Sequence, residues 1–226
     1  MADRNRASWA LAVVLPLVLL SAPALWNGFP LLQYDTGGYL ARWYEGTLVP
    51  SRAVVYGLIL NAGVPTWFWG TVLAQAAATA WVVALTLRAH GLGGRPWWLL
   101  GVIAALSVLT TLPWLTAILL TDIFAGLGML ALYLLLLRPQ TLSRRERVAL
   151  IALIAVSAAT HSATFGVLLA LVAAGCVATL VHRSRMTFTS LGNGALALTL
   201  GAMLVFAAPA RAVPDVPLEL YLEHVE

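Results

Sequence analysis

Residues 123–147 read IFAGLGMLALYLLLLRPQTLSRRER, and this stretch decides the class of the fold. Its first fifteen residues carry no charge, whereas the next ten hold four arginines and one glutamate. In lipid the backbone must satisfy its own hydrogen bonds, so a continuous apolar run of this kind forms a helix. Arginines directly after such a run are typical of the cytoplasmic border of a membrane span.

The rest of the chain has the same character. Of its 226 residues, 61% are hydrophobic and only 10% are charged, whereas a soluble domain carries about a quarter charged residues. Most of its apolar runs are long enough to cross a hydrocarbon core of about 30 Å. The runs are 7–26, 67–87, 97–113, 123–137, 148–160, 164–181 and 191–208. The sequence therefore predicts an all-α, polytopic transmembrane bundle with seven crossings, which forms a single domain over residues 1–226.

The basic residues indicate the orientation of this bundle. All 13 are arginines, and ten of them lie at the amino terminus and in alternate connections. The other three, Arg42, Arg52 and Arg211, fall on the opposite side. The positive-inside rule therefore places the amino terminus in the cytoplasm and the carboxyl terminus outside. We expect the bacterial inner membrane as the location, and the net charge of +4 is not a sign of nucleic-acid binding.

The first run has a second interpretation as a cleaved signal peptide, because Ala22-Pro23-Ala24 resembles a cleavage site. Its length of nearly twenty apolar residues exceeds a typical signal core and favours a membrane helix. The lone cysteine, Cys176, excludes an intrachain disulfide. The sequence lacks a Walker loop, a Cys/His metal spacing and a nucleophile elbow. It also lacks lysine, which excludes a retinal Schiff base.

The first outer connection, residues 27–64, is the longest in the chain. It begins with Tyr34-Asp35-Thr36-Gly37-Gly38-Tyr39 and continues through an aromatic-rich stretch to Arg52 and Tyr56. Tyrosine and tryptophan favour the level of the lipid headgroups. We therefore expect one or two short interfacial helices here, and an outer tail over residues 211–226.

Three titratable residues are expected to reach this outer face. Acidic groups at membrane depth are costly, so Asp35 and Asp122 are candidates for function. Asp122 directly precedes the run 123–137, which Arg138 follows, and about 16 residues at 1.5 Å each lift Asp122 roughly 24 Å from that end. His161 follows the short run 148–160 and rises to a similar level.

Each of these residues also has a structural alternative. Asp35 or Thr36 could cap a short helix that begins at Gly37, and Thr121 or Asp122 could cap the helix of residues 123–137. A lone histidine in a turn is usually structural. Arg52 could pair with phosphate through two parallel hydrogen bonds, or extend to the headgroups as a solvated loop arginine. If the functional interpretation holds, Asp35, Asp122 and Arg52 line one cavity, with His161 close by.

The order of these features resembles the amino-terminal part of the C-type (GT-C) integral membrane glycosyltransferases. The shared features are a first membrane helix, a long outer loop with an early acid followed by Tyr and Arg, and a second acid after the third membrane helix. The family includes protein mannosyltransferases and bacterial enzymes that decorate lipid A. The likeness covers mainly residues 7–137. It departs at Thr36, where family members commonly have a second acid, and family members are usually longer.

The resemblance implies transfer of a sugar from a polyprenyl-phosphate donor at the extracytoplasmic face. It implies that Asp35 is the general base or orients the nucleophile, and that Asp122 binds the acceptor or a divalent metal ion. Arg52 would hold the donor phosphate, with Tyr39 and Tyr56 beside the substrate. His161 is our addition from topology.

Two other classes remain open on the sequence. A non-catalytic scaffold or remnant subunit would keep the fold and bind a lipid or a membrane partner. A transporter or channel subunit would place ionisable residues near the bilayer midplane. The chain could also be a fragment of a longer enzyme, or act with a carboxy-terminal partner subunit.

Overall fold

The computed structural model describes residues 2–45, 49–182 and 186–207, and the regular secondary structure in this part of the chain is helical. The expected all-α class is confirmed. The α-helices are α1 (Ala2–Asn27), α2 (Tyr34–Tyr44), α3 (Val54–Gly63), α4 (Trp69–Ala89), α5 (Pro96–Leu109), α6 (Leu112–Ala117), α7 (Asp122–Leu137), α8 (Arg144–Thr160), α9 (Ser162–His182) and α10 (Phe188–Ala207). Two short 3-10 turns, η1 (Val64–Thr66) and η2 (Pro139–Thr141), join them.

Three helices of the described residues are long and apolar enough to cross a membrane. They are α4, α10 and residues Ser162–Val181 of α9. Helices α1, α5, α7 and α8 coincide with the four other apolar runs of the sequence. The structure thus supports a membrane protein, and the number of crossings stays a prediction.

The prediction of one helix over the third run, residues 97–113, is wrong at the carboxyl end of the run. Helix α5 stops at Leu109 because Thr110 adopts an extended backbone conformation. A new helix, α6, begins at Leu112 with Pro113 in its first turn. Proline lacks an amide hydrogen, which only the first turn of a helix can spare, so it starts a helix more readily than it continues one.

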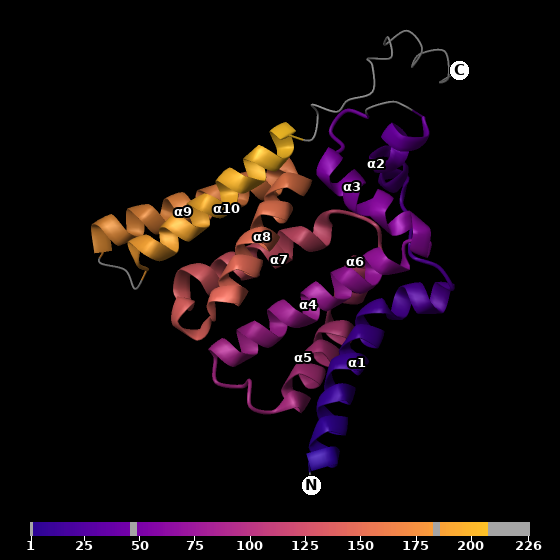
Figure 1. Ribbon diagram of the computed structural model, residues 1–226, viewed down its shortest axis with the longest axis horizontal. Helices are drawn as coiled ribbons and strands as arrows, with labels where there is room; N and C mark the ends of the chain where they lie inside the picture. Colours follow the sequence, from indigo (N-terminus) through magenta and orange to yellow (C-terminus); the bar gives the residue numbers. More distant parts are fainter. Residues whose placement is uncertain (1, 46–48, 183–185, 208–226) are drawn as a thin grey trace.

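The helices form two groups that meet along α4 and α7 (Figure 1). The first group is α1, α4, α5 and α6, with a small core of Leu20, Ala76, Ala80 and Ile103. The second is α7, α8, α9 and α10, and α9 and α10 lie side by side. Helix α3 contacts both groups through α4, α8 and α10. This arrangement brings the starts of α2 and α7 to one region of the molecule.

Glycines allow close approach between helices of the second group. A Cβ atom on Gly201 of α10 would lie 2.9 Å from the Ala155 carbonyl oxygen and 2.9 Å from the Ala158 Cβ atom of α8. A Cβ atom on Gly128 of α7 would lie 2.8 Å from the Ser157 Cβ atom. Small residues at helix contacts are the usual means of packing in membranes, where water does not drive helices together.

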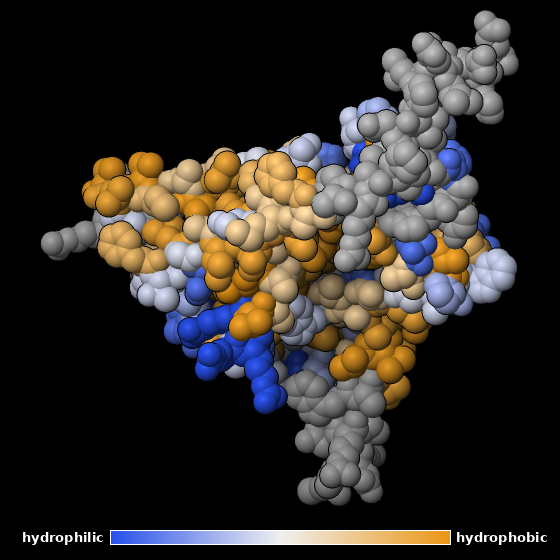
Figure 2. All heavy atoms as spheres, turned by 45° about the horizontal axis from the view of Figure 1, so that its top comes forward, coloured by the Kyte–Doolittle hydropathy of each residue, from blue (hydrophilic) through white to orange (hydrophobic). Residues whose placement is uncertain are grey.

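Much of the molecular surface is apolar. Figure 2 shows hydrophobic side chains over most of one face, with hydrophilic side chains gathered toward its borders. On α9 the exposed large side chains include Val167, Leu171 and Val177. A soluble monomer rarely exposes contiguous apolar area on this scale. The surface is the one expected of a protein whose long helices contact lipid.

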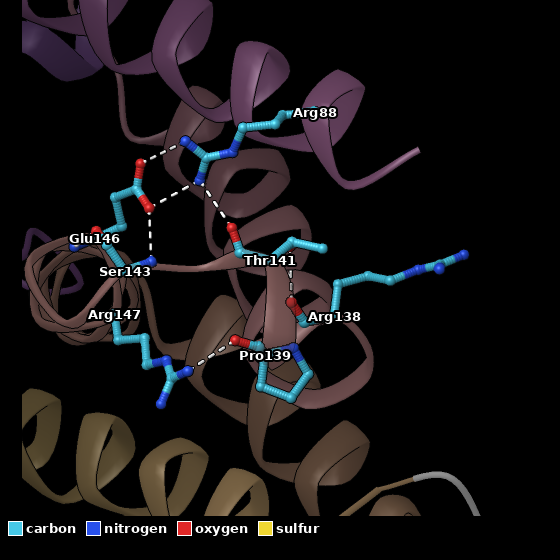
Figure 3. A network of polar contacts seen from close by, with 7 residues as sticks. All are labelled: Arg88, Arg138, Pro139, Thr141, Ser143, Glu146 and Arg147. Atoms are coloured by element: carbon cyan, nitrogen blue, oxygen red, sulfur yellow. Dashed lines mark hydrogen bonds and ion pairs between the residues drawn. The ribbon is translucent and has the colours of Figure 1, made fainter. Parts of the chain in front are cut away.

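The arginine-rich connection between α7 and α8 is well ordered by hydrogen bonds (Figure 3). Arg147 donates to the Pro139 carbonyl oxygen over 2.9 Å, and the Thr141 hydroxyl donates to that of Arg138 over 2.8 Å. Ser143 caps α8 and exchanges hydrogen bonds with Glu146 in a capping box. Some of the arginines assigned to the cytoplasmic side therefore also shape the fold.

The first long connection contains two helices, α2 and α3, as the sequence predicted, and their interfacial location stays a prediction. The segment before α2 pairs with the segment after α6 in a short parallel bridge. The Leu31 amide donates to the Ala117 carbonyl oxygen over 3.0 Å, and the Leu119 amide donates to that of Leu31 over 2.9 Å. The expected outer tail, residues 211–226, lies outside the described residues.

Candidate functional site

Helix α2 positions Asp35 in its first turn. The helix begins at Tyr34, so the predicted cap at Asp35 or Thr36 for a helix starting at Gly37 is wrong. It starts earlier because the Gln33 amide donates to the Thr36 hydroxyl over 3.0 Å. That hydroxyl donates in turn to the Leu119 carbonyl oxygen over 3.1 Å. A carboxylate in the first turn is stabilised by the helix dipole, and the Asp35 side chain is 39% exposed.

Arg52 forms an ion pair with Asp35. Its Nη2 atom donates to Asp35 Oδ1, and its side chain is only 25% exposed. Its guanidinium carbon lies 5.8 Å from the centre of the Tyr39 ring, a distance at which cation–π attraction operates. A Cβ atom on Gly38 would lie 3.2 Å from Arg52 Cγ. The absence of a side chain at Gly38 thus lets Arg52 lie along α2 rather than extend away as a solvated loop arginine.

Aromatic rings connect this ion pair to the start of α7. Tyr39 and Tyr56 meet edge to face with ring centres 4.9 Å apart, and Tyr56 meets Phe124 at 6.0 Å. Tyr56 is fully buried. Burial, and to a lesser extent the neighbouring Tyr39 and Asp122, raises the pKa of Tyr56, so its phenol stays neutral.

A buried glutamine anchors Tyr56, and the sequence analysis missed it. The Tyr56 hydroxyl donates to Gln75 Oε1 over 3.3 Å. Gln75 Nε2 donates to the carbonyl oxygens of Thr116 and Ile118 over 3.0 and 3.1 Å. The available signal was a lone amide within the apolar run 67–87, since polar groups at membrane depth require partners.

Asp122 and His161 lie together in a pocket of about 220 Å³. Thr121 occupies the N-cap position of α7 but makes no capping hydrogen bond, and Asp122 is the first residue of that helix. His161 separates α8 from α9 in an extended conformation. The lining residues are Thr121, Asp122, Ala125, Met129, His161, Ala163, Thr164 and Val167. Asp122 and His161 therefore line the same pocket, and a shared functional role for them stays a prediction.

Asp35 and Arg52 do not line this pocket. This pocket is therefore not the expected cavity shared by Asp35, Asp122 and Arg52. Two contacts connect the ion pair of Asp35 and Arg52 with this pocket. The Thr36 hydroxyl is hydrogen-bonded to Leu119, three residues before Asp122, and the Tyr56 ring meets Phe124, two residues after it.

A metal role for Asp35 or Asp122 stays a prediction. Within the described residues, no group of three or more His, Cys, Asp or Glu side chains is arranged to hold a metal ion. Asp35 instead has a cationic partner in Arg52.

No family model, curated protein or solved structure matches this chain. The likeness to C-type glycosyltransferases therefore rests on the residues themselves and stays a proposal.

Proposed function

We propose that the chain is a C-type glycosyltransferase that uses a polyprenyl-phosphate-linked sugar as donor. The ion pair of Asp35 with Arg52 is the observation that carries this proposal. The pair places a carboxylate, which can accept a proton, beside a guanidinium, which can hold a phosphate. The two residues lie 17 positions apart in the chain. Tyr39 is buried beside this pair and can hold the guanidinium in place.

The proposal includes the membrane arrangement. The chain crosses the bacterial inner membrane seven times, through α1, α4, α5, α7, α8, α9 and α10, with α2 and α3 at the outer interface. The arginine distribution supports an amino terminus in the cytoplasm. Asp35, Asp122 and His161 then lie at the extracytoplasmic side.

In the proposed reaction, an acceptor hydroxyl attacks the anomeric carbon of the donor sugar. The bond between that carbon and the phosphate oxygen breaks, and polyprenyl phosphate leaves. Asp35 takes the hydroxyl proton, and Arg52 stabilises the charge on the departing phosphate. Donor phosphate competes with Asp35 for the guanidinium, so donor binding releases the carboxylate at the moment when a base is needed.

A non-catalytic scaffold subunit is the second candidate. The observation that favours it is the same ion pair, because a carboxylate held by arginine is also what a structural contact between α2 and the start of α3 requires. Its partner would be the lipid bilayer or a second membrane subunit.

Replacement of Asp35 by asparagine separates these candidates. Asparagine keeps the shape and loses the proton acceptor, so transfer should fall by roughly 10²–10⁴-fold, while insertion and thermal stability stay nearly unchanged. Glu45→Gln is the matched control, because Glu45 is an exposed acid at the end of the same helix. The assay follows sugar transfer in membranes from a polyprenyl-phosphate donor, with any genomic partner subunit added.

Two outcomes would count against the enzyme. Undiminished transfer by the asparagine variant would remove Asp35 from catalysis. A wild-type protein inactive with every donor and partner would favour the scaffold.

A further inference from the structure

The pocket at Asp122 and His161 lies between the first turns of two helices that run alongside each other. Asp122, Ala125 and Met129 follow one face of α7, at spacings of three and four residues. Ala163, Thr164 and Val167 line it from α9. The pocket therefore runs from the helix ends down along both helices.

The chemistry of its wall changes along this direction. Thr121, Asp122 and His161 lie at the helix ends, whereas Met129 lies seven residues into α7 and Val167 five residues into α9. At 1.5 Å per residue these apolar side chains are about 7–10 Å further along the helices. The polar end and the apolar end of the pocket are thus about 7–10 Å apart, a distance that a short alkyl chain can span.

The apolar end continues into the exposed surface. Val167 is 48% exposed and Met129 is 41% exposed. Leu171, one turn beyond Val167 on α9, is also exposed. A molecule in the pocket can therefore extend along the apolar surface of α9 without leaving contact with hydrophobic side chains.

The Asp122 carboxylate sets the chemistry of the polar end. Asp122 is exposed within it, and its carboxylate accepts hydrogen bonds and repels phosphate or another carboxylate. His161 and the two threonines can each accept or donate a hydrogen bond. The group that satisfies this set is a neutral hydroxyl, which donates to the carboxylate and accepts from a neighbour.

We infer that this pocket binds the hydroxyl end of a lipid, whose chain lies over Met129 and Val167. The binding does not rest on the proposed function, because Asp35, the proposed base, does not line this pocket. The pocket volume of about 220 Å³ is below the range of roughly 300–1,000 Å³ of pockets that enclose drug-sized ligands. It therefore holds the head and the first carbons of the lipid, and the bilayer holds the rest.

The test uses the full chain in lipid nanodiscs and a photoactivatable long-chain alcohol with a diazirine near its hydroxyl end. Cross-linked peptides are located by mass spectrometry. The alcohol should label residues 121–129 and 161–167. Its methyl ether cannot donate to Asp122, so it should label them roughly tenfold less. Asp122→Ala should reduce labelling by the alcohol by a similar factor.

A steric variant guards against misfolding as the explanation. Val167→Trp fills the pocket from a half-exposed position and should abolish labelling. Val177→Trp is the matched control, because Val177 is exposed on the same helix and does not line the pocket. Equal labelling in both tryptophan variants would overturn the inference.

The remaining comparisons identify what else could bind. Stronger labelling by the corresponding phosphate monoester would show an anion site, and displacement by a soluble serine peptide would show a peptide acceptor; either result overturns the lipid assignment. No donor is present in this experiment. Specific labelling here, together with no sugar transfer in the separate assay with a polyprenyl-phosphate donor, would therefore reject the proposed function and keep the binding site.

Discussion

Arg88 at the end of α4 binds Glu146 of α8 through both carboxylate oxygens (Figure 3). Its Nη1 and Nη2 atoms lie 2.8 and 2.7 Å from Oε1 and Oε2, and Nη2 also donates to the Thr141 carbonyl oxygen over 3.0 Å. The hydrogen bond with Arg88, supported by those from Ser143, lowers the pKa of Glu146 to about 2. This contact ties the first group of helices to the second at the arginine-rich end.

The depressed pKa of Glu146 predicts an acid-dependent loss of stability. A carboxyl whose pKa is lower in the folded state stabilises that state above its unfolded pKa of 4.5, and loses this contribution as the pH falls toward about 2. Because both partners are partly exposed, the effect should be modest and weaker in salt. Thermal unfolding in detergent between pH 7 and 3 measures it. Glu146→Gln should lower stability at pH 7 and flatten this part of the pH profile; an unchanged profile would contradict the assignment.

Gly201 should be intolerant of a methyl group, because its Cβ atom would meet the backbone of α8. Gly201→Ala should cost about 1–3 kcal/mol of stability. Gly192→Ala on the same helix is the control, since nothing lies within 4 Å of its Cβ position. We expect a lower melting temperature only for the Gly201 variant. Equal melting temperatures would show that α8 and α10 can separate at little cost.

Gln75 should contribute to stability through the groups that it satisfies. Gln75→Leu leaves the Tyr56 hydroxyl and two carbonyl groups without this partner, at a cost of roughly 1–3 kcal/mol for a buried group. Tyr56→Phe leaves Gln75 Oε1 unpaired and should cost less. In the Gln75→Leu background, Tyr56→Phe should cause no further loss of stability from this hydrogen bond. Thermal unfolding of the wild type, both single variants and the double variant measures this. Strict additivity would mean that the 3.3 Å contact contributes nothing.

Surface labelling tests the proposed orientation. In a Cys176→Ala background, Glu45→Cys should react with an impermeant thiol reagent applied to the outside of intact cells. Gln140→Cys, exposed in the arginine-rich connection, should react only after the membrane is opened. The reverse pattern would place Asp35 in the cytoplasm and reject the proposed donor chemistry with it.

The apolar runs predicted the helices because each run is a local property of the chain. Residues 123–137 became α7 with a one-residue difference at its start. The end of α5 was missed because Thr110 and Pro113 act against an apolar pattern that continues past them. Hydropathy records burial in lipid and carries little information on backbone conformation.

The candidate site was only partly accessible from sequence. Its residue types were read from the sequence, and their common outer level stays a prediction. The pairing of Asp35 with Arg52 could not be predicted, because it depends on how the connection folds back on α2. The role of Gln75 depends on carbonyl groups more than forty residues away. Tertiary hydrogen bonds of this kind leave no periodic signal in a single sequence.

The bridge of Leu31 with Ile118 gives the molecule a mechanical linkage. The amide hydrogens of Leu31 and Leu119 both form hydrogen bonds between the two extended segments, so displacing one segment alone must break both bonds. One segment leads within four residues to Asp35, and the other within four residues to Asp122. The two acids are therefore joined through the backbone by this bridge, and deuterium exchange at these two amides would report how often it opens.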